Sequence, residues 1–187
     1  MLHERFKIRQ WHENPQGVLG TVRCRRWHDG GNVLLIGDAA HAVVPFHGQG
    51  MNLGFEDCVV LDQVLDRDPP DWETAFEAFQ DEQIDNANAI ADMALENYIE
   101  MRDTVRDPKY VLRHDLAFAL EQRLPDRFIP RYSMIMFHDE IPYAVARDRG
   151  NLQRELLEDL TADAGSMDDI DLDAAAALVE SRLPPLH

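Results

Sequence analysis

The residues best suited to chemistry lie together at positions 37–52, which read GDAAHAVVPFHGQGMN. Asp38 offers a carboxylate that accepts hydrogen bonds from sugar hydroxyls, and Gly48 and Gly50 let the backbone approach a flat ligand closely. A helix beginning near Met51 would point its unpaired N–H groups and the positive end of its dipole at that ligand. This spacing predicts a site for a polar ligand, such as a phosphate-bearing or flavin-like molecule.

Regular elements on both sides must position this segment. The apolar run at 33–36 predicts a short strand covered on both faces, as in an α/β sheet. Asp38 would then lie at the carboxyl end of that strand, where ligands of open α/β sheets bind. Partial alternation at 17–27 predicts another strand, and residues 28–31 a turn. Residues 53–66 predict an amphipathic helix that Pro69 and Pro70 stop.

The remainder of the chain is predicted to be mainly helical. Asp71 is a good N-cap for a long helix in which apolar residues recur at three- and four-residue steps as far as Met101. Asp107 and Pro108 are typical of another helix start, with that helix running to about Arg123. Helices are expected at 142–160 and 172–183, whereas 124–142, with three prolines, predicts an irregular or short extended segment. The fold class is therefore α+β, mainly helical.

Composition excludes several functions. Hydrophobic residues make up 45% of the chain, and no apolar run approaches the roughly 18 residues of a membrane span. A formal charge of −17 argues against nucleic acid and anionic membrane as partners. The two cysteines and the lack of a leader predict a reducing cytoplasm. His41 and His47 match no zinc-ligand spacing, so no metal site is expected.

Residues 37–52 resemble the second flavin-binding motif of single-component FAD-dependent aromatic hydroxylases, which is Gly-Asp-Ala-Ala-His followed by Pro and a Gly-x-Gly-x-Asn turn. The longer strings PFHGQGMNLGFEDC, NYIEMRD and RFIPRYSMIMF resemble the kynurenine 3-monooxygenase family in particular. The similarity runs from about Trp11 to about Leu160. It implies that FAD is the cofactor and NADPH a transient reductant. It also implies that O2 and L-kynurenine are converted to 3-hydroxykynurenine, as in tryptophan catabolism.

The resemblance also implies which residues form the site. The expected cofactor contacts are Gly37, Asp38, Pro45, Gly48, Gly50, Met51 and Asn52. The expected substrate contacts are Phe46, His47, Asn97, Met101 and Tyr132. No residue is expected to act as a general acid or base, because the amino group of the substrate can push electrons into its own ring.

Hydroxylases of this family are more than twice as long and begin with a βαβ unit whose Gly-x-Gly-x-x-Gly turn binds the pyrophosphate. No such turn occurs here. The resemblance therefore implies a C-terminal part that needs the missing N-terminal half as its partner and is inactive alone. Residues 1–27 would end the substrate-binding domain. Residues 28–106 would be the C-terminal part of a Rossmann-like FAD-binding domain, with one strand, a flavin-contacting helix and the long helix, and 107–187 a helical C-terminal region.

Other interpretations remain open at this stage. Asp38 alone would be an ordinary turn residue, and Tyr98 and Met101 alone would be core residues. Five arginines suggest an anion funnel for NADPH, but interleaved acids favour solvated helix faces; they are Arg102, Arg106, Arg113, Arg127 and Arg131. At the level of function, the chain could come from another hydroxylase of the superfamily, acting on a phenol or in the ubiquinone pathway. It could also be a helical interaction module with a decayed flavin motif.

Overall fold

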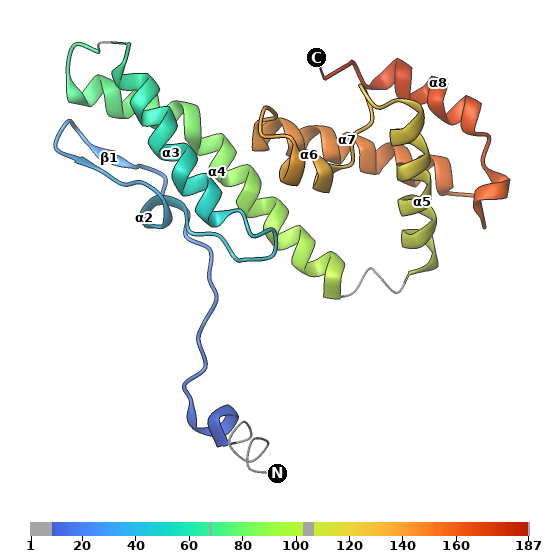
Figure 1. The fold of residues 1–187 in the computed structure, drawn as a ribbon, viewed down its shortest axis with the longest axis horizontal. Helices are drawn as coiled ribbons and strands as arrows, with labels where there is room; N and C mark the ends of the chain where they lie inside the picture. Colours follow the sequence, from blue (N-terminus) through green and yellow to red (C-terminus); the bar gives the residue numbers. More distant parts are fainter. Residues whose placement is uncertain (1–8, 68, 103–106, 187) are drawn as a thin grey trace.

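A computed structural model describes residues 9–67, 69–102 and 107–186 (Figure 1). The elements are β1 (His28–Asp29), β2 (Val33–Leu34), α2 (Asp38–His41), α3 (Gly50–Leu65), α4 (Trp72–Arg102), α5 (Pro108–Arg123), α6 (Arg131–Phe137), α7 (Tyr143–Thr161), the 3-10 helix η2 (Met167–Asp169) and α8 (Leu172–Arg182). The expected mainly helical α+β composition is confirmed. Among the described residues, no helix combines the length and hydrophobicity needed to cross a bilayer.

Helices α3 and α4 pack side by side over the small β-hairpin (Figure 1). Asp71 caps α4 as predicted, because its Oδ1 accepts a hydrogen bond from the Thr74 N–H at 2.8 Å. The apolar stripe of α4 is buried at Phe79 and Ile90. Towards the end of the helix the stripe reaches the surface, and Met101 is exposed. This packing forms the core beneath the segment at 37–52.

The strand predictions are wrong in their extent. The described residues 17–27 hold no strand, and β2 comprises only two residues paired antiparallel with β1. The expected burial on both faces is also wrong, since Val33 is 52% and Ile36 40% exposed. A strand is buried only when neighbouring strands and helices cover it. In this chain the described residues provide a single short partner, so Val33 and Ile36 are exposed, whereas Leu34 and Leu35 pack against the core.

A second core lies between α5, α7 and α8, where Leu116, Leu156 and Val179 are buried. Helix α7 connects the two cores, since Ala146 packs in the first and Leu156 in the second. The predicted start of α5 is confirmed, because the Asp107 side chain accepts from the Lys109 N–H and Pro108 occupies the first turn. The predicted helices at 142–160 and 172–183 are also confirmed, as α7 and α8.

The prediction for residues 124–142 is wrong in part, because α6 forms there. Its prolines lie where helices tolerate them: Pro130 is the N-cap of α6 and Pro142 the N-cap of α7. Proline costs little at a helix start, since the N–H it lacks would have no intrahelical partner. Met134 and Ile135 are buried, so tertiary packing stabilises this short helix.

Candidate functional site

The turn at Gly37 and Asp38 is attached to α3 by a buried carboxylate. Asp57 is fully buried, and its Oδ2 accepts hydrogen bonds from the Gly37 N–H and from His41 Nε2, each at 2.7 Å. Gly37 has a φ of 57°, which disfavours any residue with a Cβ. Gly54 of α3 lies against it, since a Cβ at Gly54 would be 3.9 Å from the Gly37 Cα. The turn at Gly37 and helix α3 are therefore neighbours in space.

The residues predicted to contact the cofactor lie on the surface around this turn. Gly37 and Gly50 are half-buried, whereas Asp38, Pro45, Gly48, Met51 and Asn52 are exposed. Asp38 is the first residue of α2, and its side chain has no hydrogen bond or ion pair within the described part of the chain. Its carboxylate is thus accessible to a ligand.

The N-terminus of α3 is also open. The side chain of its N-cap, Gln49, accepts no hydrogen bond from a backbone N–H of the first helical turn. Instead, Gln49 Oε1 accepts from Asn52 Nδ2 at 2.7 Å and from the Tyr143 hydroxyl at 3.1 Å. Burial, together with the charge of Glu56, raises the pKa of Tyr143 to about 12, so its hydroxyl stays a donor. The first N–H groups of α3 therefore keep their positive potential for a ligand.

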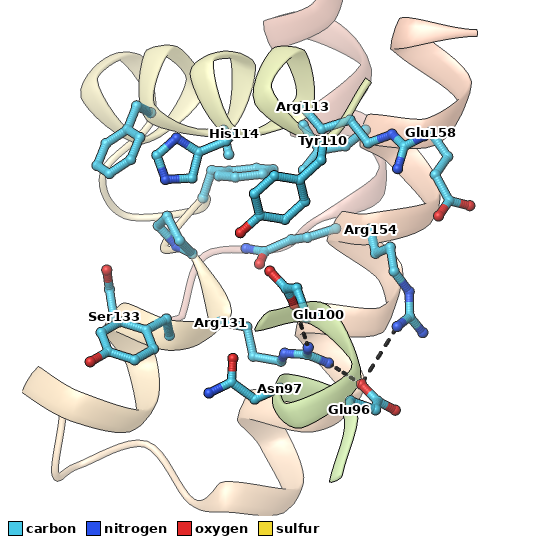
Figure 2. Close-up of a pocket in the computed structure, with 18 of the residues that line it drawn as sticks. Glu96, Asn97, Glu100, Tyr110, Arg113, His114, Arg131, Ser133, Arg154 and Glu158 are labelled. Carbon is cyan, nitrogen blue, oxygen red and sulfur yellow. Dashed lines mark hydrogen bonds and ion pairs between the residues drawn. The ribbon is translucent and has the colours of Figure 1, made fainter. Parts of the chain in front are cut away.

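A cavity of about 550 Å³ lies beside the loop that carries His47, between the end of α4 and helices α5, α6 and α7 (Figure 2). Among the predicted substrate residues, His47, Asn97 and Tyr132 line this cavity. Phe46 and Met101 are not part of the lining. Phe46 packs against Tyr98 with ring centroids 4.6 Å apart.

His47 faces the cavity without a hydrogen-bonding partner. Its side chain is 8% exposed, and neither ring nitrogen has a partner in the described residues. Its ring centroid is 6.0 Å from that of Tyr132. Burial, and then the charge of Arg131, lowers the pKa of His47. A neutral imidazole offers one donor and one acceptor, and both ring nitrogens of His47 are buried close to the Met93 backbone.

Asn97 holds the loop that carries His47. Its Nδ2 donates to the Phe46 carbonyl oxygen at 2.7 Å, which connects α4 to the loop between α2 and α3. The Asn97 side chain also lies at the edge of the cavity, as Figure 2 shows. It can therefore influence a bound molecule through the position of the loop.

Charged groups of both signs line the cavity. Arg131, whose side chain is 16% exposed, lies 2.6 Å from Glu96 and 4.0 Å from Glu100. Arg154 lies 3.5 Å from Glu96 (Figure 2). Burial, followed by Glu100, raises the pKa of Tyr110 to about 12.

The interpretation of the arginines as solvated is therefore wrong for Arg131, which is enclosed and ion-paired. Arg127 donates to the Leu183 carbonyl oxygen, and Arg113 lines the cavity. Arg102 lies over the Tyr98 ring, and Arg106 lies outside the described residues.

Sequence reasoning missed Asp57 and Gln49. Asp57 shares a buried face of α3 with Leu53 and Val64, so an acid on an apolar helical stripe was an available signal. Gln49 left no comparable signal, because its partners come from distant helices. Among the described residues, no three His, Cys, Asp or Glu side chains gather as a metal site.

The chain is similar in sequence to known proteins over most of its length. A model of the FAD binding domain family matches residues 7–67. The chain is 50% identical over 177 residues to the kynurenine 3-monooxygenase of Stenotrophomonas maltophilia (strain K279a). It is 49% identical over 176 residues to that of Xanthomonas axonopodis pv. citri (strain 306) and 48% identical over 177 residues to that of Xanthomonas campestris pv. campestris (strain B100).

These matches cover 94% to 95% of this chain but only 38% of each relative. The resemblance found in the motifs is thereby confirmed, and it extends beyond the predicted limits at about Trp11 and Leu160 to nearly the whole chain. The chain is homologous to kynurenine 3-monooxygenases over 38% of their length, and its residues 7–67 match the FAD binding domain family.

Proposed function

We propose that this chain is the C-terminal portion of an FAD- and NADPH-dependent enzyme that hydroxylates L-kynurenine to 3-hydroxykynurenine with O2. The observation that supports this best is that one loop connects an open turn to a cavity. Asp38 is exposed on the turn, the N-terminus of α3 is open, and His47, from the loop between them, lines the cavity. A cofactor on the turn would thus lie next to a substrate in the cavity.

The residues of the turn fit a flavin. The Asp38 carboxylate would accept a hydrogen bond from a ribityl hydroxyl. The free N–H groups at Gly50, Met51 and Asn52 would stabilise negative charge on the pyrimidine edge of the reduced ring. Bound FAD, reduced by NADPH, would supply the activation of dioxygen. Phe46, beside the turn, would form an apolar wall that keeps water away.

The cavity fits a zwitterionic aromatic molecule. Its volume of about 550 Å³ lies within the range of small-molecule sites, roughly 300–1,000 Å³. The Tyr132 hydroxyl would donate to the substrate carboxylate, and His47 would complete the polar contacts. We place Asn97 at the border of the substrate, acting at least partly through its bond to Phe46. Met101, four residues further along α4 and outside the cavity lining, would border the substrate only at the edge of the cavity.

The proposal also requires a partner for an exposed apolar surface. On α3, Met51 is 70% exposed, and Phe55 and Val59 follow at four-residue steps and are also exposed. Val18 is almost fully exposed in the stretch that extends from the helices (Figure 1). We propose that the flavin and the N-terminal part present in the relatives cover this surface. The free cysteines favour a reducing cytoplasm as the location.

The test uses the full-length enzyme, meaning this chain joined in frame to the N-terminal part of the Stenotrophomonas relative. We expect a yellow protein that oxidises NADPH when kynurenine is added and yields hydroxylated product. Both NADPH oxidation and product should be measured, because a loosely held substrate can trigger oxidation without hydroxylation. A simple phenol used better than kynurenine would indicate another hydroxylase of the superfamily. A protein that folds but binds no flavin would favour an interaction module.

A further inference from the structure

Asp57 is an unusual residue to find in the core. Among the described residues it is the one carboxylate that is buried, with 0% exposure, and burial of a carboxylate is costly unless hydrogen bonds compensate it. Its Oδ2 accepts two hydrogen bonds, whereas its Oδ1 has no partner. Both bonds go to the same turn, at Gly37 and at His41. The Asp57 carboxylate therefore holds this turn in place through both of its hydrogen bonds.

The turn is also attached to α4, through His41 and Trp27. The ring centroids of His41 and Trp27 are 4.9 Å apart. The backbone N–H of Trp27 donates to Gln80 Oε1 of α4 at 2.7 Å. Asp57 itself belongs to α3. The turn is thus held between two helices by buried groups, with Asp57 at the centre of the contacts.

Asp38 follows Gly37 directly, and its side chain has no bond of its own to hold it. The direction in which Asp38 leaves the turn depends on the backbone of Gly37, whose φ of 57° is one of many conformations open to glycine. The Asp57 bond to the Gly37 N–H restricts that choice. A freed Gly37 would let Asp38 sample other directions.

We propose that Asp57 is a positioning residue for the flavin. Its buried carboxylate fixes Gly37 and His41, so that the Asp38 carboxylate meets the ribityl chain without reorganisation. This inference rests on the proposed function, because it assumes that Asp38 contacts FAD. Asp57 itself lies beneath the turn and does not touch the cofactor.

A double-mutant cycle on FAD affinity tests this. Flavin-free full-length enzyme is titrated with FAD, and binding is followed by flavin fluorescence. Asp38→Ala should weaken FAD roughly 10- to 100-fold, through loss of a charge-assisted hydrogen bond. Asp57→Asn keeps the shape but loses the charge, and should weaken FAD about fivefold or more. The double variant should match Asp38→Ala alone within about twofold, because Asp57 acts through Asp38.

Asp62→Asn is the matched control, since it removes the same charge from an exposed position of α3; its FAD affinity should equal that of the parent. If Asp57→Asn fails to fold, His41→Asn removes the other partner of Asp57 and should show the same dependence on Asp38. If Asp57 only stabilised the fold, Asp57→Asn would lower the unfolding temperature, and its effect on FAD affinity would be the same with or without Asp38.

The inference is overturned by parent-like FAD affinity in Asp57→Asn, or by losses that multiply in the double variant. Either result leaves the proposed function standing. A parent enzyme that binds no FAD contradicts the proposed function and this inference together.

Discussion

At the scale of single residues, His47 differs from the paired charged groups that line the cavity. His47 is enclosed among Tyr132, Arg131 and the end of α4, and no described residue bonds its ring nitrogens. Unpaired polar groups are destabilising when buried. Their presence here is the kind of feature that a ligand resolves.

The pKa of His47 makes the stability of the 187-residue chain depend on pH. It lies below the ordinary value of 6.5, so on acidification the unfolded state takes up a proton before the folded state does. The free energy of unfolding should therefore be greatest above that value and fall as the pH drops below it. Urea unfolding from about pH 7 to about pH 5 measures this. His47→Gln should have a flatter profile; identical slopes would refute the assignment.

Tyr132 should affect substrate binding and not cofactor content. In the full-length enzyme, Tyr132→Phe removes one hydrogen bond to a carboxylate, at a side chain that is 54% exposed. We expect a loss of about 1.5 kcal/mol, which corresponds to a roughly tenfold rise in KM for kynurenine. Steady-state kinetics and bound FAD are measured together. Tyr98→Phe, outside the cavity lining, is the control, and equal KM values in the two variants would argue against the contact.

At the scale of elements, the contact between α6 and α7 shapes the cavity. Gly150 of α7 allows the Arg131 side chain to lie against the helix, and a Cβ at Gly150 would be 2.5 Å from the Arg131 Cδ. Arg131 in turn reaches Glu96 of α4. The absence of a side chain at one position therefore sets the location of a charged pair in the cavity.

Gly150→Ala should destabilise the chain even though alanine favours helices. Overpacking costs about 1–3 kcal/mol, and the gain in helix propensity offsets about 1 kcal/mol of it. Thermal unfolding of the chain should show a lower midpoint. Gly54→Ala is the matched control, because its Cβ would meet only an ordinary contact at 3.9 Å, and this variant should be at least as stable as the parent. A more stable Gly150→Ala would show that α6 can shift freely.

Local signals explain which elements the sequence predicts. Asp71 and Asp107 cap helices through bonds to residues two or three positions away, so each start is visible in a few residues. Helix α6 was missed because its stability comes from burying Met134 and Ile135 against distant helices. The strand at 33–36 was overestimated for a related reason, since strands depend on partners remote in sequence.

At the scale of the whole molecule, the candidate flavin site is open on one side. The chain spans 38% of the length of its relatives, and the residues predicted to contact FAD are exposed or half-buried. The surface at Met51 and Phe55 continues from this site along α3. The described residues thus form one side of the candidate flavin site, and the opposite side is exposed.

The isolated chain should therefore bind FAD weakly or not at all. The same residues in the full-length enzyme should hold a yellow flavin, because we expect the N-terminal part to add the contacts to adenine and pyrophosphate. Gel filtration of both proteins after incubation with FAD, followed by an absorbance spectrum of each peak, makes the comparison. The isolated chain emerging with stoichiometric FAD would show that these residues suffice for binding.

The sequence by itself determined the glycine-framed turn, the flavin family and the helices beyond residue 49, with the exception of α6 and η2. Helix caps, apolar periodicity and a contiguous motif are encoded by neighbouring residues. Only the tertiary structure decided that Asp57 lies beneath Gly37, that Asn97 bonds to the Phe46 carbonyl and that Arg131 is enclosed beside Glu96. These partners are separated by 20, 51 and 35 positions. Their proximity depends on how whole helices pack, and no local pattern records that.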